Sequence, residues 1–218
     1  ADIDLTGKNC PNIGTSSNHF EGVFDGQYHR LTIDATATSA GDSFFTGLAG
    51  TVKNTHFDGV LHTSINKCGG IAGELFGATI QNCWCSVQIV SSFAGDSAYG
   101  GIASRASATG CRILNTVFDG AILAEKAYNV GVVATTSSIE ISNCVMAGNI
   151  QAMNPEPTGN PSYTIVRNNG TAVLTNCFYV NPWMNLNENT TQVTEEQLAS
   201  GEICYLLNGT QANVQWYQ

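Results

Sequence analysis

The sequence predicts an all-β fold, a β-solenoid of about six coils that is closed at its C-terminal end by a short helical cap. Two series of recurring residues predict the solenoid, and a change of hydrophobic pattern after residue 194 predicts the cap. The composition agrees, since only 11% of the 218 residues are charged and 43% are hydrophobic. An ordinary soluble domain has about 25% charged residues, so this chain favours short stacked strands over amphipathic helices.

The first series is an aliphatic residue, any residue and then Asn. It reads VKNTHFDG at 52–59, IQNCWCSV at 80–87, ILNTVFDG at 113–120, ISNCVMAG at 141–148 and LTNCFYVN at 174–181. Intervals of 28, 33, 28 and 33 residues separate the asparagines Asn54, Asn82, Asn115, Asn143 and Asn176. Asn tolerates left-handed bends, and stacked amides can hydrogen-bond to one another. We therefore expect a structural ladder of Asn at one bend of successive coils.

The residues after these asparagines bear on the eight cysteines. An even number of cysteines in a secreted chain permits a disulfide framework. However, Cys83, Cys144 and Cys177 each follow a ladder asparagine, at the position that Thr55 and Thr116 hold in the other copies. Small side chains of similar volume at one position favour packing inside the bend. Buried free thiols are therefore the preferred interpretation, and disulfides remain the alternative.

The second series is Gly, an aliphatic residue and a small residue. It reads GLAG at 47–50, GIAG at 70–73, GIAS at 101–104 and GVVA at 131–134. Glycine within a strand marks a bend or a close approach of two backbones. We therefore expect Gly47, Gly70, Gly101 and Gly131 to occupy one corner of successive coils. The aliphatic residue after each glycine should point into the core.

The ends of the chain fit a single domain over residues 1–218. Residues 1–45 are expected to form an opening segment and the first coil, 46–181 the repeated coils, and 182–218 a loop and the helical cap. Thr194 and Gln197 make a capping box before a helically spaced apolar pattern. A cap of this kind would cover the open strand edge at the end of a stack.

The glycine motifs resemble the GLUG repeat, and this resemblance covers roughly residues 20–181. Ser104 and Ala134 depart from the repeat at its last glycine. The tail from Thr194 to Asn208 is similar to the closing segment that follows such repeats in surface proteins of gut anaerobic bacteria. GLUG repeats occur in adhesin-like proteins and in the non-catalytic parts of some IgA-cleaving metallopeptidases. The resemblance implies a right-handed parallel β-helix, an adhesin-like role and a place at the bacterial outer surface after removal of a signal segment.

The charge of the chain narrows the classes of partner. The formal net charge is −9, with eight Lys and Arg, which argues against nucleic acid and against an anionic membrane surface. Acidic glycans would be repelled on average, unless a local basic patch binds them. No apolar run is long enough for a transmembrane helix, so we expect no direct membrane insertion. The expected partner is a host surface protein or a glycan, bound by a monomer without a cofactor.

Motifs that carry chemistry are missing from the sequence. His-Glu-x-x-His, Gly-x-Ser-x-Gly and the phosphate-binding loop do not occur. His56 and His62 lie six residues apart, with Asp58 between them and no Cys nearby, whereas zinc needs three or four converging ligands. We therefore expect no metal site and no catalytic residues. The resemblance to GLUG repeats implies the same, because the motif residues of that family are structural.

One pair of carboxylates keeps an enzyme among the alternatives. Asp58 and Asp119 each lie four residues after a ladder asparagine, with Ser86 between them in the same column. Two strand spacings separate them by roughly 10 Å. A retaining glycosidase needs about 5 Å and an inverting one about 6.5–9.5 Å. Asp-Gly is also a turn signal in its own right, so catalysis by this pair is not the favoured interpretation.

Aromatic side chains are the candidates for ligand binding. Trp84 and Tyr99 are the two selected, because aromatic faces stack on sugar rings. Packing against the coil face is the competing interpretation, and we expect Trp183 to seal the last coil against the cap. The favoured function is a non-catalytic, secreted or cell-surface adhesin-like module. A β-helical polysaccharide hydrolase or lyase and a structural stalk of a larger surface protein are the alternatives.

Overall fold

The computed structural model describes residues 1–9, 11–95, 97–126, 131–154, 163–209 and 216. Strands make up 54% of the chain and helices 6%, which confirms the all-β prediction. The strands are β1 (Ile3–Asp4), β2 (Val23–Ala37), β3 (Phe45–Leu48), β4 (Thr51–Thr63), β5 (Lys67–Gly69), β6 (Ala72–Leu75), β7 (Thr79–Cys85), β8 (Gln88–Ser91), β9 (Ala98–Gly100), β10 (Ala103–Ala106), β11 (Cys111–Leu114), β12 (Val117–Phe118), β13 (Ala121–Lys126), β14 (Val133–Ser142), β15 (Val145–Met146), β16 (Asn149–Asn154), β17 (Val166–Thr175), β18 (Cys177–Tyr179) and β19 (Thr190–Gln192). The helices are α1 (Glu195–Ala199) and α2 (Glu202–Asn208).

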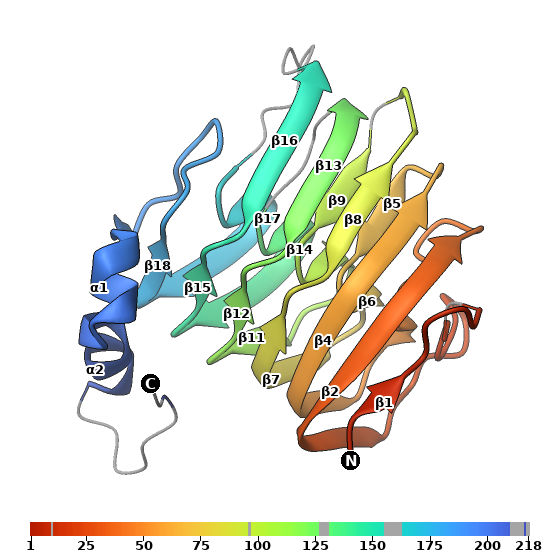
Figure 1. The fold of residues 1–218 in the computed structure, drawn as a ribbon, viewed down its shortest axis with the longest axis horizontal. Coiled ribbons are helices and arrows are strands. Elements are labelled where there is room, and N and C mark those ends of the chain that lie inside the picture. The colour runs from red at the N-terminus through yellow and green to blue at the C-terminus, as the bar shows by residue number, and fades with distance from the viewer. Residues whose placement is uncertain (10, 96, 127–130, 155–162, 210–215, 217–218) are drawn as a thin grey trace.

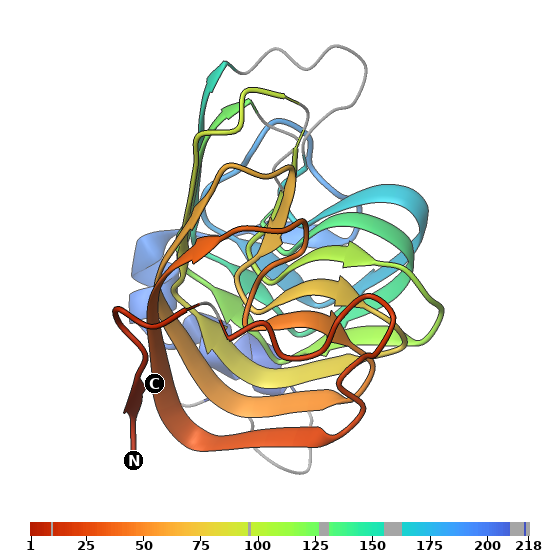
Figure 2. The ribbon, with the colours of Figure 1, turned by 90° about the vertical axis from the view of Figure 1, so that its right-hand side faces the viewer.

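Every strand pair within the described residues is parallel, and every pair except β18 with β19 joins segments about one repeat apart. β4 pairs with β7 and β8, β7 pairs with β11 and β12, and β14 pairs with β17. Seventeen strands form one large sheet, and β5 and β9 form a second, smaller one. The strands lie side by side from β1 and β2 near one end to β18 near the other (Figure 1). Viewed from the β2 end, the chain bends from one face of the molecule to another and closes a turn, and each later turn lies behind the one before it (Figure 2).

This register places equivalent aliphatic residues in one buried column. Val52 pairs with Ile80, Ile80 with Ile113, and Ile113 with Ile141, and all four are buried. The residues that follow the asparagines are buried as well, including Thr55 and the thiols of Cys83, Cys144 and Cys177. Alternation along each strand therefore sends one set of side chains inward and the next set outward.

The five expected ladder asparagines lie at one bend and are joined to one another. Asn54, Asn82, Asn115, Asn143 and Asn176 have φ values of 52°, 53°, 48°, 53° and 51°, in the left-handed region that Asn tolerates. The Nδ2 of each asparagine donates to the Oδ1 of the preceding one, at 3.2, 3.0, 3.1 and 2.9 Å along the series. Asn54 donates to Asp25 at 3.0 Å, which continues the chain of hydrogen bonds by one further strand.

Three of the four motif glycines occupy equivalent positions in successive repeats, and the fourth, Gly47, does not. Ala72, Ala103 and Val133 pair with one another, so Gly70, Gly101 and Gly131, two residues earlier, share one column. Phe45 also pairs with Ala72, which puts Ser43 in that column and leaves Gly47 opposite Glu74. The prediction that Gly47 shares the corner is therefore wrong. Its interval of 23 residues to Gly70 is too short for the register, because the true repeat spans about 28 to 33 residues.

The reason for glycine in this column is a close backbone approach. Gly70, Gly101 and Gly131 do not adopt a positive φ. A Cβ atom on Gly70 would lie 2.2 Å from the carbonyl oxygen of Gly101, and one on Gly101 would lie 2.2 Å from that of Gly131. One on Gly131 would lie 2.2 Å from the oxygen of Thr164. Any side chain at these positions would push the neighbouring strand away.

The seven described cysteines are free thiols, and six of them are buried; Cys10 lies outside the described residues. Burial raises the pKa of Cys83 to about 12 and also raises that of Cys85. These thiols are therefore protonated and packed at neutral pH, as expected of small core side chains.

The two helices follow the last strands of the sheet (Figure 1). Thr194 and Gln197 form the expected capping box at the start of α1. Ile203 and Leu207 of α2 are buried together with Val145, Phe178 and Val193. The helices therefore pack against outward-facing apolar side chains of β15 and β18.

Candidate functional site

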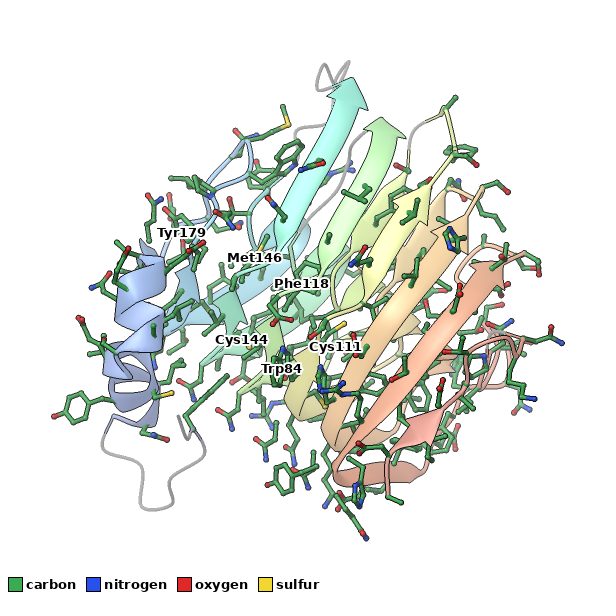
Figure 3. All side chains as sticks on the ribbon, in the orientation of Figure 1. Trp84, Cys111, Phe118, Cys144, Met146 and Tyr179 are labelled. Atoms are coloured by element: carbon green, nitrogen blue, oxygen red, sulfur yellow. The ribbon has the colours of Figure 1, made fainter. Side chains whose placement is uncertain are left out.

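One outward-facing column of side chains changes from covered to exposed along the sheet. His56 pairs with Trp84, Trp84 with Val117, Val117 with Val145, and Val145 with Phe178. Val145 and Phe178 are buried beneath the helices, whereas 47% of Trp84 is exposed. Trp84 projects from β7 between two inward cysteines, on the face drawn toward the viewer (Figure 3). An apolar stripe thus emerges from beneath the helices and ends at an exposed indole.

A groove of about 600 Å³ runs along this stripe. Trp84, Val117 and Ala147 lie along its floor, and Leu198, Ile203 and Leu207 of the helices form its wall. Its polar lining includes His56, Asn82, Asn115 and Asp119. A concave and mainly apolar surface with a few polar groups is the usual form of a small-molecule site.

The exposed indole is held in place by His56. The two rings are stacked, with centroids 4.2 Å apart and planes inclined by 6°. His56 Nε2 lies 3.0 Å from Ser86 Oγ. Burial lowers the pKa of His56, as does the charge of Arg30, so the imidazole is neutral at neutral pH. A neutral ring against one indole face leaves the other face and the edge of Trp84 to the groove.

The hydroxyl of Ser86 connects the histidine with a carboxylate. Ser86 Oγ donates to Asp119 Oδ1 at 2.7 Å. Because Ser86 donates to Asp119, its oxygen accepts from His56 Nε2. In a serine hydrolase the histidine lies between the serine and the aspartate and removes the serine proton. Here the serine lies between the other two residues, so this arrangement orients polar groups and does not activate a nucleophile.

Asp58 and Asp119, which the sequence places in one column, contact different residues. Phe57, the residue before Asp58, and Phe118, the residue before Asp119, both pair with Cys85, the residue before Ser86, so Ser86 lies between the two carboxylates in the column as expected. Asp58 Oδ2 lies 3.6 Å from Arg30 Nη1, while Asp119 accepts from Ser86. Each carboxylate thus contacts a different neighbour, and no hydrogen bond between described residues joins one carboxylate to the other.

The prediction that Tyr99 binds a ligand is wrong. Its side chain is fully buried, and its hydroxyl donates to the Ile65 carbonyl at 2.5 Å and lies 2.6 Å from Ser91 Oγ. Burial also raises the pKa of Tyr99 to about 12. The residue belongs to β9 of the small sheet, where it packs inward. A single aromatic residue in a short segment gave no alternation from which its inward direction could be read.

The other residues singled out in the sequence lie elsewhere. Trp183 packs, partly buried, against the main hydrophobic core, and its backbone N–H donates to Thr164 Oγ1 at 2.9 Å. His62 faces Asp34 at 3.7 Å, apart from His56. Among the described residues no group of three His, Cys, Asp or Glu side chains is placed to hold a metal ion. Within the same residues, no helix is long and apolar enough to cross a bilayer.

Sequence reasoning did not find the groove. Trp84 was selected, but its stacking partner His56 and the helix wall were not, because they come from segments far apart in the chain. Alternation in HFD and WCS, 28 residues apart, places His56 and Trp84 on one face, and this signal could have paired them. Comparisons with protein-family models, with curated proteins and with solved structures give no match for this chain.

Proposed function

We propose that this chain is a non-catalytic, adhesin-like module that binds a glycan in the groove beside Trp84. The observation that carries the proposal is the exposed indole, stacked on His56 and bordered by Asp119 within the groove. The faces of sugar rings that carry C–H bonds pack on aromatic rings, while their hydroxyls need hydrogen-bond partners. The groove offers both kinds of contact within reach of one ring.

The architecture that we infer is a right-handed parallel β-helix of about six coils with a C-terminal helical cap. Parallel pairing of segments about one repeat apart supports the solenoid, and the burial of Ile203 and Leu207 against Val145 and Phe178 supports the cap. In this architecture the helices both close the end of the stack and build one wall of the groove. The resemblance to GLUG repeats belongs to the same proposal, together with secretion, a bacterial surface location and a monomeric state.

Polar groups of the groove would select the ligand. Asp119 is exposed and already accepts from Ser86, and a carboxylate has further lone pairs for sugar hydroxyls. Asn82 and Asn115 border the floor. Because the accessible charge of this groove is negative, it favours a neutral sugar over an acidic one.

Two other functions would give different results. A polysaccharide-processing enzyme needs an acid–base pair or an activated nucleophile, and the separate partners of Asp58 and Asp119 disfavour that reading. A structural stalk needs no groove, and an exposed Trp would be a liability on it. The binding module is therefore the function that the groove supports best.

The experiment is a glycan and host-matrix array probed with the domain, followed by chromatography of any bound glycan for cleavage products. Saturable binding without products supports the module. Products that disappear in Asp58→Asn or Asp119→Asn would establish the enzyme instead. No binding to any glycan would contradict the proposal and favour the stalk.

A further inference from the structure

The floor of the groove beside Trp84 has an aromatic and polar half and an aliphatic half. Two outward-facing columns cross it side by side. In the first column, Val117 and then Val145 follow Trp84 toward the helices. In the second column, Ala147 follows Asp119, since each lies two residues after one of the paired valines. Both columns therefore become aliphatic in the direction of α1 and α2.

The aliphatic half of the floor meets the helices in an apolar corner. Four partly buried side chains line the groove there and pack against the buried cluster of the helices and the last strands: Val117, Ala147, Leu198 and Trp216. Leu198 belongs to α1, and Leu207 of α2 also lines the groove. A ligand group that enters the apolar corner would therefore meet hydrophobic side chains on the floor and on the wall.

A carboxylate lies at the border of the apolar corner. Asp119 follows Val117 by two residues, about 6.6 Å along an extended chain, and its side chain is exposed. Its Oδ1 accepts from Ser86 at 2.7 Å. A carboxylate accepts through both of its oxygens, so Oδ2 can receive a hydrogen bond from a ligand. One acceptor thus lies beside the corner, one strand away from Trp84.

The apolar corner discriminates between sugars. A plain hexose carries hydroxyl groups around its ring, and a hydroxyl placed in the corner would lose water without gaining a partner. An acetamido group instead presents an N–H donor and a methyl group on one planar amide. Its N–H can donate to Asp119 while its methyl packs against Val117 and Leu198, with the sugar ring on Trp84. An acetamido substituent therefore fits this part of the groove better than a hydroxyl.

We propose that the groove beside Trp84 selects N-acetylated hexosamines, with the acetamido methyl in the apolar corner and the acetamido N–H on Asp119. The inference rests on the proposed glycan-binding function and adds the class of sugar to it. The ligand is neutral, which agrees with the negative accessible charge of the groove. An unacetylated amino sugar would be attracted to Asp119 by its charge, yet it has no methyl group for the corner.

The test is a titration of the ¹⁵N-labelled protein, followed by NMR, with three matched ligands: methyl β-glucoside, its 6-deoxy analogue and methyl N-acetyl-β-glucosaminide. The galacto counterparts form a second series. We expect saturable shifts at the amides of Trp84, Val117 and Asp119. In at least one series the N-acetylated sugar should bind about tenfold or more tightly than its parent hexose, the usual factor for one apolar group in a fitted pocket. In saturation-transfer spectra the acetyl methyl should receive the most saturation, because it lies among aliphatic side chains.

Val117→Thr keeps the shape of the side chain and places a hydroxyl in the apolar corner. It should lower the ratio of the two affinities about fivefold or more, because the acetyl methyl loses an apolar contact and the parent hexose gains a partner. Val173→Thr is the matched control, since Val173 is an exposed valine of β17 that does not line the groove, and it should leave the ratio unchanged. The ratio compares two ligands on one protein, so a general loosening of the fold cancels. Asp119→Ala should weaken binding of the N-acetylated sugar about tenfold or more.

Three results would overturn the inference. They are equal affinities of the N-acetylated and parent sugars in both series, a 6-deoxy sugar that binds as tightly as the N-acetylated one, and the same affinity ratio in Val117→Thr and Val173→Thr. If another glycan of the array binds saturably and the N-acetylated sugars do not, this inference fails while the binding module stands. If no glycan of any kind binds, the proposed function itself fails.

Discussion

The imidazole of His56 and the indole of Trp84 lie face to face across two neighbouring parallel strands, with ring centroids 4.2 Å apart and planes inclined by 6°. The same imidazole hydrogen-bonds to Ser86, which in turn donates to Asp119. One residue thus fixes both the aromatic platform and the polar group beside it. The groove beside Trp84 is therefore preorganised before any ligand arrives.

Replacing His56 by alanine should remove this support. We expect His56→Ala to lower the free energy of unfolding by about 1–2 kcal/mol, because an aromatic pair and one hydrogen bond are lost. His62→Ala is the control, since His62 makes only an exposed contact with Asp34 and should change stability by less than about 0.5 kcal/mol. Urea unfolding of the two variants measures both effects. Equal losses in the two variants would contradict the role given to the stack.

Protonation of His56 should destabilise the fold. Burial, followed by the charge of Arg30, lowers the pKa of His56 below 6.5, although Asp58, Asp119 and Asp2 oppose this shift. Between the folded and the unfolded pKa the unfolded chain binds more protons, so stability is present above pH 6.5 and is lost as the pH falls toward the folded pKa. Melting temperatures from pH 7.5 to 5 should fall more steeply for the wild type than for His56→Phe, which keeps a ring without titrating. Parallel curves would contradict this prediction.

Substitutions at Asn115 separate two contributions of the asparagine ladder to stability: the side-chain hydrogen bonds and the left-handed backbone conformation. This residue has a φ of 48°, donates to Asn82 and accepts from Asn143. Asn115→Gly keeps the backbone conformation and removes the two hydrogen bonds, so we expect a loss of about 1–2 kcal/mol. Asn115→Ala adds the strain of a left-handed conformation, about 1 kcal/mol more. Denaturant unfolding measures the stability of the two variants. An alanine variant as stable as the glycine variant would show that the left-handed conformation at position 115 costs alanine no stability.

Much of the fold could be predicted because it rests on local rules that repeat. The Asn positions give the register, since a left-handed residue marks each bend, and the aliphatic residue two places earlier then points inward. Gly47 was misplaced because the motif was matched by its letters, while the register depends on the interval between copies. Only the pairing of Phe45 with Ala72 reveals that Ser43, and not Gly47, lies in the glycine column.

The groove depends on contacts that no local pattern contains. The pattern of Leu198 and Ile203 predicts a helix, yet it does not say which face of the sheet the helix covers. Tyr99 shows the opposite error, because an aromatic side chain in a short strand has no neighbours whose alternation gives its direction. Burial of its hydroxyl against Ile65 and Ser91 is a tertiary fact. The sequence therefore predicts the repeating core better than the surface built by its ends.

The glycine column should not tolerate a single methyl group. A Cβ atom at position 101 would lie 2.2 Å from the Gly131 carbonyl oxygen and 2.6 Å from ring carbons of Phe118. Gly101→Ala should therefore destabilise the protein by about 3 kcal/mol or more, as overpacking does in a rigid interior. Gly110→Ala is the control, since its Cβ would approach nothing closer than 3.9 Å and only its φ of 82° is unfavourable. If thermal unfolding shows the same loss in both variants, close approach does not explain the glycine column.

The central claim is that Trp84 is the platform of a glycan-binding groove, and titration calorimetry tests it most directly. The best glycan from the array is titrated into the wild type, Trp84→Ala and Tyr205→Ala. Tyr205 is exposed on α2 and does not line the groove. We expect Trp84→Ala to weaken binding about tenfold or more, as the loss of an aromatic anchor does, while Tyr205→Ala binds like the wild type. Unchanged affinity in Trp84→Ala would contradict the account.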